Sequence, residues 1–202
     1  MTDLILHHAP DNASLCVRLA LDAAGAGYST KLVDRRATAQ KSSHYLALNP
    51  NGLIPVLETP DGVLFETAAI LLWLSDRYPA LLPLDGSARS SSLKWLFWLL
   101  NTLHPTLRML FYPDQYIDPA HTDALALNTR ARLNTQLDIL NAAVENAPWI
   151  GGATPTILDC YLCPMVRWIQ LYPLAAIERP TLRKYPNLHR IAVQNERHDS
   201  TR

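Results

Sequence analysis

A proline stands at the start of a predicted strand in the segment from Asn49 to Leu57, where Ile54 directly precedes Pro55. Proline has no backbone N–H and is normally avoided inside a sheet, because it removes a hydrogen bond between strands. A cis Ile54–Pro55 bond would turn the preceding backbone outward, and Ile54 could then offer its N–H and C=O to an extended peptide ligand. The alternative is an ordinary trans proline at a sheet edge. The segment is therefore a candidate peptide-binding edge.

A candidate anion site follows at Glu66 and Thr67, directly before an apolar stretch that begins at Ala68. Thr67 is predicted to be the N-cap residue of a helix, where unpaired backbone N–H groups would bind an anion. A ligand carboxylate would gain from both the Thr67 hydroxyl and the helix dipole. Glu66 could contact an amino group beside that carboxylate. The alternative is a threonine that only caps its helix, after a glutamate on the surface.

The elements that must hold these residues form an α/β pattern over residues 1–80. Short apolar runs bounded by turn residues predict strands, and apolar residues at helical spacing predict helices. The order is β-α-β, then an irregular helical stretch, then β-β-α. Strands are expected at residues 4–6, 29–34, 54–58 and 62–65, and helices at residues 14–24 and 68–78.

Beyond residue 80 the pattern changes to helices alone. Residues 81–90 contain proline, glycine and small polar residues and are predicted to be a linker. Residues 91–202 show no convincing strand and are predicted to form an all-helical domain. Its helices are expected at residues 92–110, 119–146, 156–171 and 185–197.

The composition argues against several classes of function. The 18 Lys and Arg residues balance the 18 Asp and Glu residues, so nucleic acid is not expected as a partner, because binding phosphates needs a basic excess. The longest apolar stretches are too short to span a membrane, and no membrane association is expected. Three cysteines are too few for a disulfide scaffold, which favours the cytoplasm. The seven histidines show no metal-ligand spacing, so no metal is expected.

The cysteines themselves are predicted to be packing residues. Cys160 and Cys163 form a C-x-x-C pattern, but they lie inside a late predicted helix and share one of its faces. Cys16 lies one turn into the first helix and is expected in the core. None of the three is therefore a candidate redox residue.

Several of these segments together resemble the glutathione-binding half of glutathione S-transferases. They are the segment from Asn49 to Leu57, the run from Glu66 to Leu71, and the pair Tyr78 and Pro79. In that family the residue before a cis-proline pairs with the cysteinyl backbone of glutathione, and a Glu-Ser/Thr pair holds its γ-glutamyl end. The resemblance therefore implies glutathione contacts at Leu53, Ile54, Pro55, Glu66 and Thr67.

The resemblance continues in the second half. The stretch from Trp149 to Asp159 is similar to the loop and capping box of the family, in which Thr156 would cap a helix and Asp159 would bind back to the Thr156 amide. Tyr185 and Pro186 match the usual start of a late helix. The implied fold is a thioredoxin-like α/β N-terminal domain at residues 1–80, a linker at 81–90 and an all-α C-terminal domain at 91–202.

The group that activates the thiol is expected between the first strand and the first helix, where the family uses Tyr, Ser or Cys. In the register of the bacterial beta class, which this pattern resembles most, Ala13 replaces the cysteine and Ser14 falls on the serine beside it. The hydroxyl of Ser14 and neighbouring amides could then stabilise the thiolate, which lowers the pKa of the thiol. Asn12 is a second candidate donor. The alternative is that Ser14 is only an N-cap residue.

Two further contacts are implied by the beta class. His104 resembles a histidine that this class presents toward the thiol, and its apolar surroundings favour the neutral imidazole. The alternative is a structural histidine beside the kink expected at Pro105. The class also uses a lysine after the second strand, and Arg35 or Arg36 is the candidate here for contact with the glycyl carboxylate.

The function implied is a transferase that activates the glutathione thiol and adds it to a small hydrophobic electrophile, as in detoxification. Aromatic residues expected to wall the electrophile site are Trp98, Phe111, Tyr112 and Tyr116. One alternative is a non-catalytic glutathione-binding or stress-related protein that keeps the fold. Another is a glutathione-dependent isomerase or reductase, although the usual cysteine signatures of those families are missing. A homodimer is expected from the resemblance and from the apolar helix after Ser92.

Overall fold

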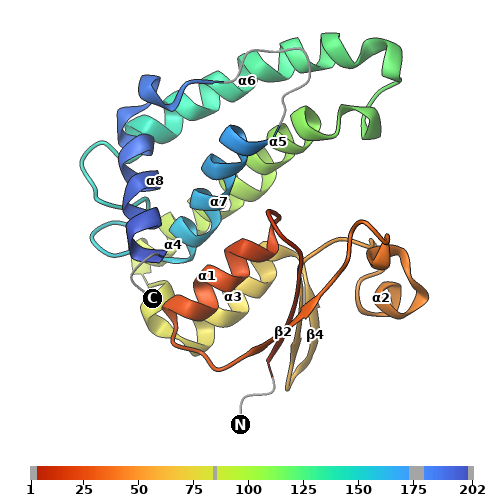
Figure 1. Cartoon of the computed structure of the whole chain (residues 1–202). Coiled ribbons are helices and arrows are strands. Elements are labelled where there is room, and N and C mark those ends of the chain that lie inside the picture. The colour runs from red at the N-terminus through yellow and green to blue at the C-terminus, as the bar shows by residue number, and fades with distance from the viewer. Residues whose placement is uncertain (1–3, 84–85, 173–179, 200–202) are drawn as a thin grey trace. The chain divides into compact units, whose positions relative to one another are not determined.

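The computed structural model describes residues 4–83, 86–172 and 180–199, and it divides the chain into two compact units, residues 1–92 and 93–202 (Figure 1). The first unit contains a sheet with helices, and the described part of the second unit is helical. The predicted combination of an α/β half and an all-α half is therefore confirmed.

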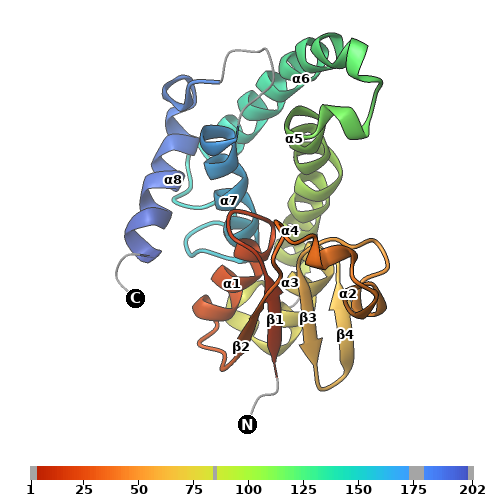
Figure 2. The same cartoon turned by 45° about the vertical axis from the view of Figure 1, so that its right-hand side comes forward.

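The sheet of the first unit has four strands in the order β2-β1-β3-β4 (Figure 2). Strand β1 pairs in parallel with β2 and antiparallel with β3, which in turn pairs antiparallel with β4. The third strand starts at Val56, directly after Pro55, rather than at residue 54, because proline cannot donate to the sheet. The strands are β1 (Ile5–His8), β2 (Ser29–Leu32), β3 (Val56–Thr59) and β4 (Gly62–Phe65).

Helices cover both faces of this sheet. Helices α1 (Ser14–Ala23) and α3 (Thr67–Arg77) lie on one face, and the short helix α2 (Ser43–Leu48) lies on the other (Figure 1). Side chains alternate along each strand, so Leu6 faces the core with α1 and α3, whereas His7 meets Tyr45 of α2. The larger core includes the fully buried residues Leu6, Val17, Leu21, Leu57, Ile70, Leu71 and Leu74.

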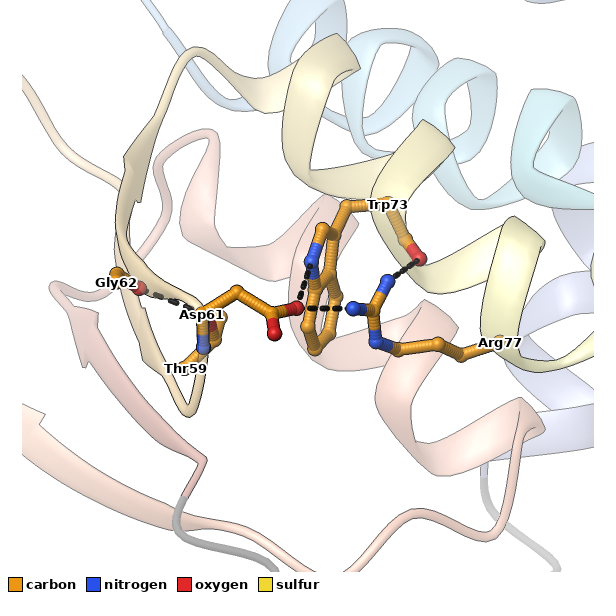
Figure 3. Close-up of polar contacts among 5 residues, drawn as sticks. All are labelled: Thr59, Asp61, Gly62, Trp73 and Arg77. Carbon is orange, nitrogen blue, oxygen red and sulfur yellow. Dashed lines mark hydrogen bonds and ion pairs between the residues drawn. The ribbon is translucent and has the colours of Figure 1, made fainter.

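The turn between β3 and β4 is fixed to α3 by an exposed polar cluster (Figure 3). The Asp61 carboxylate accepts a hydrogen bond of 3.2 Å from the Trp73 indole N–H and forms an ion pair with Arg77. The Arg77 guanidinium stacks on the Trp73 ring, 3.6 Å from its centroid. Because β4 leads directly into α3, this cluster helps to hold the residues between them.

Helix α4 (Gly86–Trp98) begins inside the predicted linker 81–90 and continues across the boundary between the units. The polar residues of its first turns explain why the sequence predicted a linker, and not a helix, at residues 86–90. Serine is uncommon inside helices because it can bond to the backbone instead, but here that bonding stays within the helix. The Ser90 hydroxyl donates to the Gly86 carbonyl, and the Ser92 hydroxyl donates to the Ala88 carbonyl.

The predicted single helix at 92–110 is divided into three parts. After α4 comes a π-helical turn, η3 (Leu99–Leu103), and then helix α5 (His104–Phe111). Pro105 has no N–H to give to the preceding turn, and the wider π-helical turn accommodates its ring without ending the helical run. The irregularity expected at Pro105 thus takes the form of a π-helical turn directly before it.

The other helices follow the predicted ranges closely: α6 (Thr122–Ala143), α7 (Ile157–Leu171) and α8 (Pro186–Asp199). Helix α5 packs against α6 and α7, and α8 packs against the same two helices. Their shared core is rich in leucine, as the helical spacing predicts. No helix within the described part of the chain has both the length and the apolar character needed to cross a bilayer.

The start of α7 confirms the predicted capping box. The Asp159 carboxylate accepts hydrogen bonds of 2.9 Å from the N–H groups of Thr156 and Ile150, while the Thr156 hydroxyl accepts from Leu158 N–H at 3.2 Å. Gly151 is required here, since a Cβ atom at that position would lie 2.4 Å from the Thr156 hydroxyl oxygen. Burial raises the pKa of Asp159 to about 6, against the effect of these donors, which lower it.

We expect Asp159 to make the stability of the protein depend on pH between about 4 and 6. Its pKa in the folded state lies above the ordinary value of 3.8, so the folded state binds more protons in this interval and stability falls as the pH rises. Asp159→Asn removes the titrating group. The free energy of unfolding of the wild type minus that of Asp159→Asn, measured by urea denaturation, should fall with pH by up to about 1.4 kcal/mol per unit. A difference that rises over this interval would contradict the assignment, and exposed Asp123→Asn is the matched substitution.

Candidate functional site

The backbone at Ile54 has the free groups expected of a peptide-binding segment, although it leads into the internal strand β3 and is not a sheet edge. The Ile54–Pro55 bond is cis, which confirms the prediction. Within the described residues, neither the N–H nor the C=O of Ile54 has a hydrogen-bond partner. Leu53 is exposed beside it, and Pro55 is buried below. An extended peptide that binds along this segment would find one donor and one acceptor on the same residue.

The loop before Ile54 is tightly constrained. Gly52 has a φ of +61°, a conformation that favours glycine, and its N–H donates to the Asn49 carbonyl at 2.9 Å. A Cβ atom on Gly52 would lie 2.8 Å from the Gln40 carbonyl oxygen, so a larger residue would displace the loop. The side chains of Tyr45 and Asn49 also bond to this loop, and sequence reasoning singled out neither of them.

The start of α3 differs in one respect from the prediction. Thr67 is the first helical residue rather than the N-cap, which is Glu66, and the Glu66 side chain forms no capping hydrogen bond. Glu66 adopts a φ of +73°, which is uncommon for a residue with a side chain and costs about 1–3 kcal/mol. This backbone places the Glu66 carbonyl to accept from Ile70 N–H at 3.0 Å.

The anion-binding potential of this helix start is nevertheless retained. Among the described residues, the N–H groups of Thr67, Ala68 and Ala69 have no hydrogen-bond partner. Thr67 is 5% exposed, whereas Glu66 is exposed to solvent. The helix end thus offers three backbone donors and a hydroxyl, with a carboxylate next to them.

The turn between β1 and α1 places Ser14 differently from the prediction. Ser14 is the first residue of α1, its N-cap is Ala13, and Ser14 is only 2% exposed. The Ser14 hydroxyl lies 2.6 Å from Asn12 Oδ1 and 3.2 Å from the Ala9 carbonyl oxygen, and it accepts from the Ala9 N–H at 3.3 Å. Since a hydroxyl carries one proton, the Ser14 proton is already engaged inside the turn. Because Ala13 is the N-cap residue of α1, the alternative that Ser14 is only an N-cap residue is wrong.

The same bonds orient the Asn12 amide. Ser14 N–H donates to Asn12 Oδ1 at 2.8 Å, and because a donor must face the oxygen, the assignment of the two amide atoms follows. The Asn12 NH2 group has no hydrogen-bond partner among the described residues, and Asn12 is half-buried. Of the two candidate thiol donors in this turn, Asn12 is therefore the one with an available N–H.

Three strands are joined by polar and charged side chains that the sequence did not single out. His7 Nε2 lies 2.7 Å from Glu58 Oε1, and Lys31 Nζ lies 2.9 Å from the same oxygen. These hydrogen bonds, first from Lys31 and then from His7, hold the pKa of Glu58 below its ordinary value. The residues come from β1, β3 and β2, and nothing in their sequence positions could show that the sheet order brings them together.

His104 belongs to the second unit and lies half-buried there among aromatic rings. Its Nδ1 lies 2.8 Å from the Tyr161 hydroxyl, and its ring centroid is 5.6 Å from that of Trp168. Burial, with a smaller contribution from Arg108, lowers the pKa of His104 to about 4, so the imidazole is neutral at physiological pH. Neutrality agrees with the sequence analysis. The role of His104 beside the thiol stays a prediction.

The remaining predicted residues fall into two groups. Arg35 and Arg36 are exposed in the loop after β2, and Tyr116 is an exposed residue of the second unit, whereas Trp98, Phe111 and Tyr112 are half-buried.

The three cysteines are buried in α1 and α7, which confirms that they pack. Among the described residues, no group of three or more His, Cys, Asp or Glu side chains could hold a metal ion.

Comparison with known proteins places this geometry in a family. Models of the glutathione S-transferase N-terminal and C-terminal domains match residues 2–76 and 119–191. A glutathione S-transferase from Escherichia coli O157:H7, GstA, is 31% identical over 168 residues, which cover 81% of each chain. The chain belongs to the glutathione S-transferase family. Its two units correspond to the two halves of that fold.

Other members of the family carry different names. The disulfide-bond oxidoreductase YfcG of E. coli K12 is 28% identical over 215 residues, covering 96% of this chain and 99% of the relative. A glutathione transferase from Burkholderia graminis, solved with two glutathione molecules per subunit, is 27% identical with a TM-score of 0.80 and covers 95% of this chain. That alignment spans 82% of the solved chain. A glutathione-related role is thus supported for the family member described here, while its reaction is left open by these names.

Proposed function

We propose that the protein is a glutathione transferase that binds glutathione in its first unit. Ile54 pairs with the cysteinyl backbone, between Leu53 and Pro55. The N–H groups at the start of α3 and the Thr67 hydroxyl bind the γ-glutamyl carboxylate, and Glu66 binds the amino group beside it. The observation that carries this proposal is the presence, in one unit, of an Ile54 backbone and a helix start that both lack partners among the described residues.

In this proposal the Asn12 amide activates the thiol. Its NH2 group donates to the sulfur and favours the thiolate, which lowers the pKa of the thiol. Ser14 was the first candidate from sequence, but its buried hydroxyl is bonded to Asn12 and to the backbone of Ala9. Ser14 therefore acts through the orientation of Asn12. The thiolate then forms a sulfur–carbon bond with a small hydrophobic electrophile, from which the leaving group departs.

A second candidate function is glutathione-dependent reduction of disulfides. It is supported by the match to the oxidoreductase YfcG over almost the whole of both chains. Cys16 is buried, so no exposed thiol of α1 would take part. One glutathione thiolate would form a mixed disulfide with the substrate and release its first thiol, and a second glutathione would release the other thiol and form glutathione disulfide. Measuring the turnover of an aryl halide and of a small disulfide with the same preparation distinguishes the two candidate functions.

We expect millimolar glutathione to bind the wild type, with Thr67→Ala binding about tenfold or more weakly. The reason is the loss of one hydrogen bond to a charged carboxylate, typically worth about 1.5–3 kcal/mol. Titration calorimetry measures both affinities. Thr30→Ala, which removes an exposed hydroxyl from β2, is the matched control and should bind as the wild type does. Absence of binding to the wild type, or equal binding by Thr67→Ala, would count against the site.

The pKa of the bound thiol should rise most in Asn12→Ala. Loss of the amide donor should also slow conjugation to a generic aryl halide by about ten- to a hundredfold, the value of one strong hydrogen bond. Ser14→Ala should have a smaller effect, because the Ser14 backbone N–H still holds Asn12. Thiolate absorbance in the ultraviolet reports the pKa.

The opposite ranking of these two variants would restore Ser14 as the activating group. A wild type that binds glutathione without shifting its thiol pKa would instead favour the non-catalytic alternative. These outcomes are distinct, because the first concerns the donor and the second concerns activation itself.

The protein is further proposed to be a cytoplasmic homodimer. The location is supported by its buried thiols, which suit a reducing compartment. The dimer is supported by membership of a family whose proteins are generally dimeric, and Phe97, an exposed apolar side chain of α4, is a candidate contact. Light scattering at micromolar concentration should return about twice the chain mass of 22.6 kDa. A monomer at this concentration would refute the dimer and leave the glutathione site untouched.

A further inference from the structure

The carbonyl of Leu53 accepts two hydrogen bonds from buried side chains. The Tyr45 hydroxyl donates to it at 2.9 Å and the Asn49 side-chain NH2 donates to it at 2.8 Å. Tyr45 is 3% exposed and Asn49 is 2% exposed. Both donors belong to helix α2 or its C-cap, so this one carbonyl is tied to the helix on the far side of the sheet from α1 and α3.

This attachment determines where the next N–H points. Leu53 C=O and Ile54 N–H are part of one peptide plane, and in a trans peptide these two groups point in opposite directions. The only cis bond among the described residues is the following one. Because the carbonyl is held toward Tyr45 and Asn49, the Ile54 N–H is directed away from them, toward the side where it has no protein partner.

Both donors are themselves held in place. The Asn49 Oδ1 accepts from Asn51 N–H at 3.1 Å, which identifies the other amide atom as the donor to Leu53. The Tyr45 ring packs in a small core with Val33 and Val56, and its centroid lies 5.9 Å from that of His7 in an edge-on contact. His7 is in turn bonded to Glu58. Burial raises the pKa of Tyr45, so its hydroxyl keeps the proton that it donates.

We propose that Tyr45 and Asn49 are positioning residues for glutathione, which orient the Leu53–Ile54 peptide so that the Ile54 N–H meets the cysteinyl carbonyl of the ligand. This inference rests on the proposed function. Neither side chain contacts the ligand or the thiol. Their effect is therefore on the binding of the peptide backbone, which is equal in the ground state and the transition state, and not on activation of the sulfur.

The sharpest test is Tyr45→Phe, which keeps the packed ring and removes only the hydroxyl. We expect glutathione to bind about fivefold more weakly, as for the loss of one hydrogen bond. The KM for glutathione should rise by the same factor, while kcat and the pKa of the bound thiol stay those of the wild type. Tyr28→Phe is the matched control, since it removes a hydroxyl bonded to Asp22 at 2.7 Å elsewhere in the same unit, and it should leave the KM unchanged.

Asn49→Asp is the second variant. It keeps the shape of the side chain and the acceptor for Asn51, but it replaces the donor to Leu53 with an oxygen. Glutathione binding should therefore weaken more than in Tyr45→Phe, because a carboxylate oxygen then faces the Leu53 carbonyl oxygen. A variant that fails to fold leaves Tyr45→Phe to decide the question.

Amide NMR of the 15N-labelled protein distinguishes a positioning role from a general loss of stability, because it measures the chemical-shift change of each amide on binding glutathione. Saturating glutathione should shift the amide protons of both Ile54 and Ala68 in the wild type. In Tyr45→Phe, the Ile54 shift should shrink while the Ala68 shift persists. The positioning role alone is overturned if the wild type binds glutathione and both variants bind it as tightly as the wild type does and show the full Ile54 shift. So does Tyr28→Phe raising the KM as much as Tyr45→Phe. A wild type that does not bind glutathione overturns the proposed function as well.

Discussion

The residues on both sides of Ile54 are tied into the fold, and Ile54 itself keeps its backbone N–H and C=O without a partner among the described residues. Unpaired backbone groups are costly when they are withdrawn from water, so a fold that maintains them near a sheet needs support around them. The support comes from the Leu53 carbonyl bonds, from Gly52 packed close to Gln40, and from strand β3, which starts at Val56. The start of α3 follows the same principle, because the strained backbone of Glu66 precedes three further N–H groups without partners.

Two buried hydroxyl groups of the first unit, those of Ser14 and Tyr45, each orient a neighbouring amide or peptide group. The Ser14 hydroxyl and N–H hold one end of the Asn12 amide, so that the other end is the available donor. The Tyr45 hydroxyl holds a carbonyl, so that the N–H of the same peptide plane points the other way. In both cases a buried hydroxyl, whose proton is already hydrogen-bonded within the protein, orients a second donor that has no partner among the described residues. Such an arrangement reduces the entropy lost on binding, since the donor is already aimed.

The second unit is stabilised by its own internal contacts. The capping box of Thr156 and Asp159 orders the start of α7, the most deeply buried helix of this unit, and Gly151 allows the preceding loop to approach it. The π-helical turn before His104 accommodates Pro105. The pair of His104 and Tyr161 then lies between α5 and α7, where burial keeps the imidazole neutral.

The sequence by itself determined the class of fold and most of the segments that are proposed to bind glutathione. Helical and strand spacing depends on local periodicity, and the cis-proline segment and the capping box each lie within a few consecutive residues, so both could be recognised from sequence. Local polarity misled in one place, where the serine-rich start of α4 resembled a linker until its hydroxyls found carbonyls within the helix. Only the tertiary structure decided which groups remain available. Whether Ser14 or Asn12 keeps a usable proton depends on the Ala9 backbone across the turn, and the direction of the Ile54 N–H depends on Tyr45 of α2 and on Asn49, the C-cap residue of that helix. These hydrogen bonds join residues only four to eight positions apart, but they depend on the path of each turn in space, which the spacing of residues along the chain does not show.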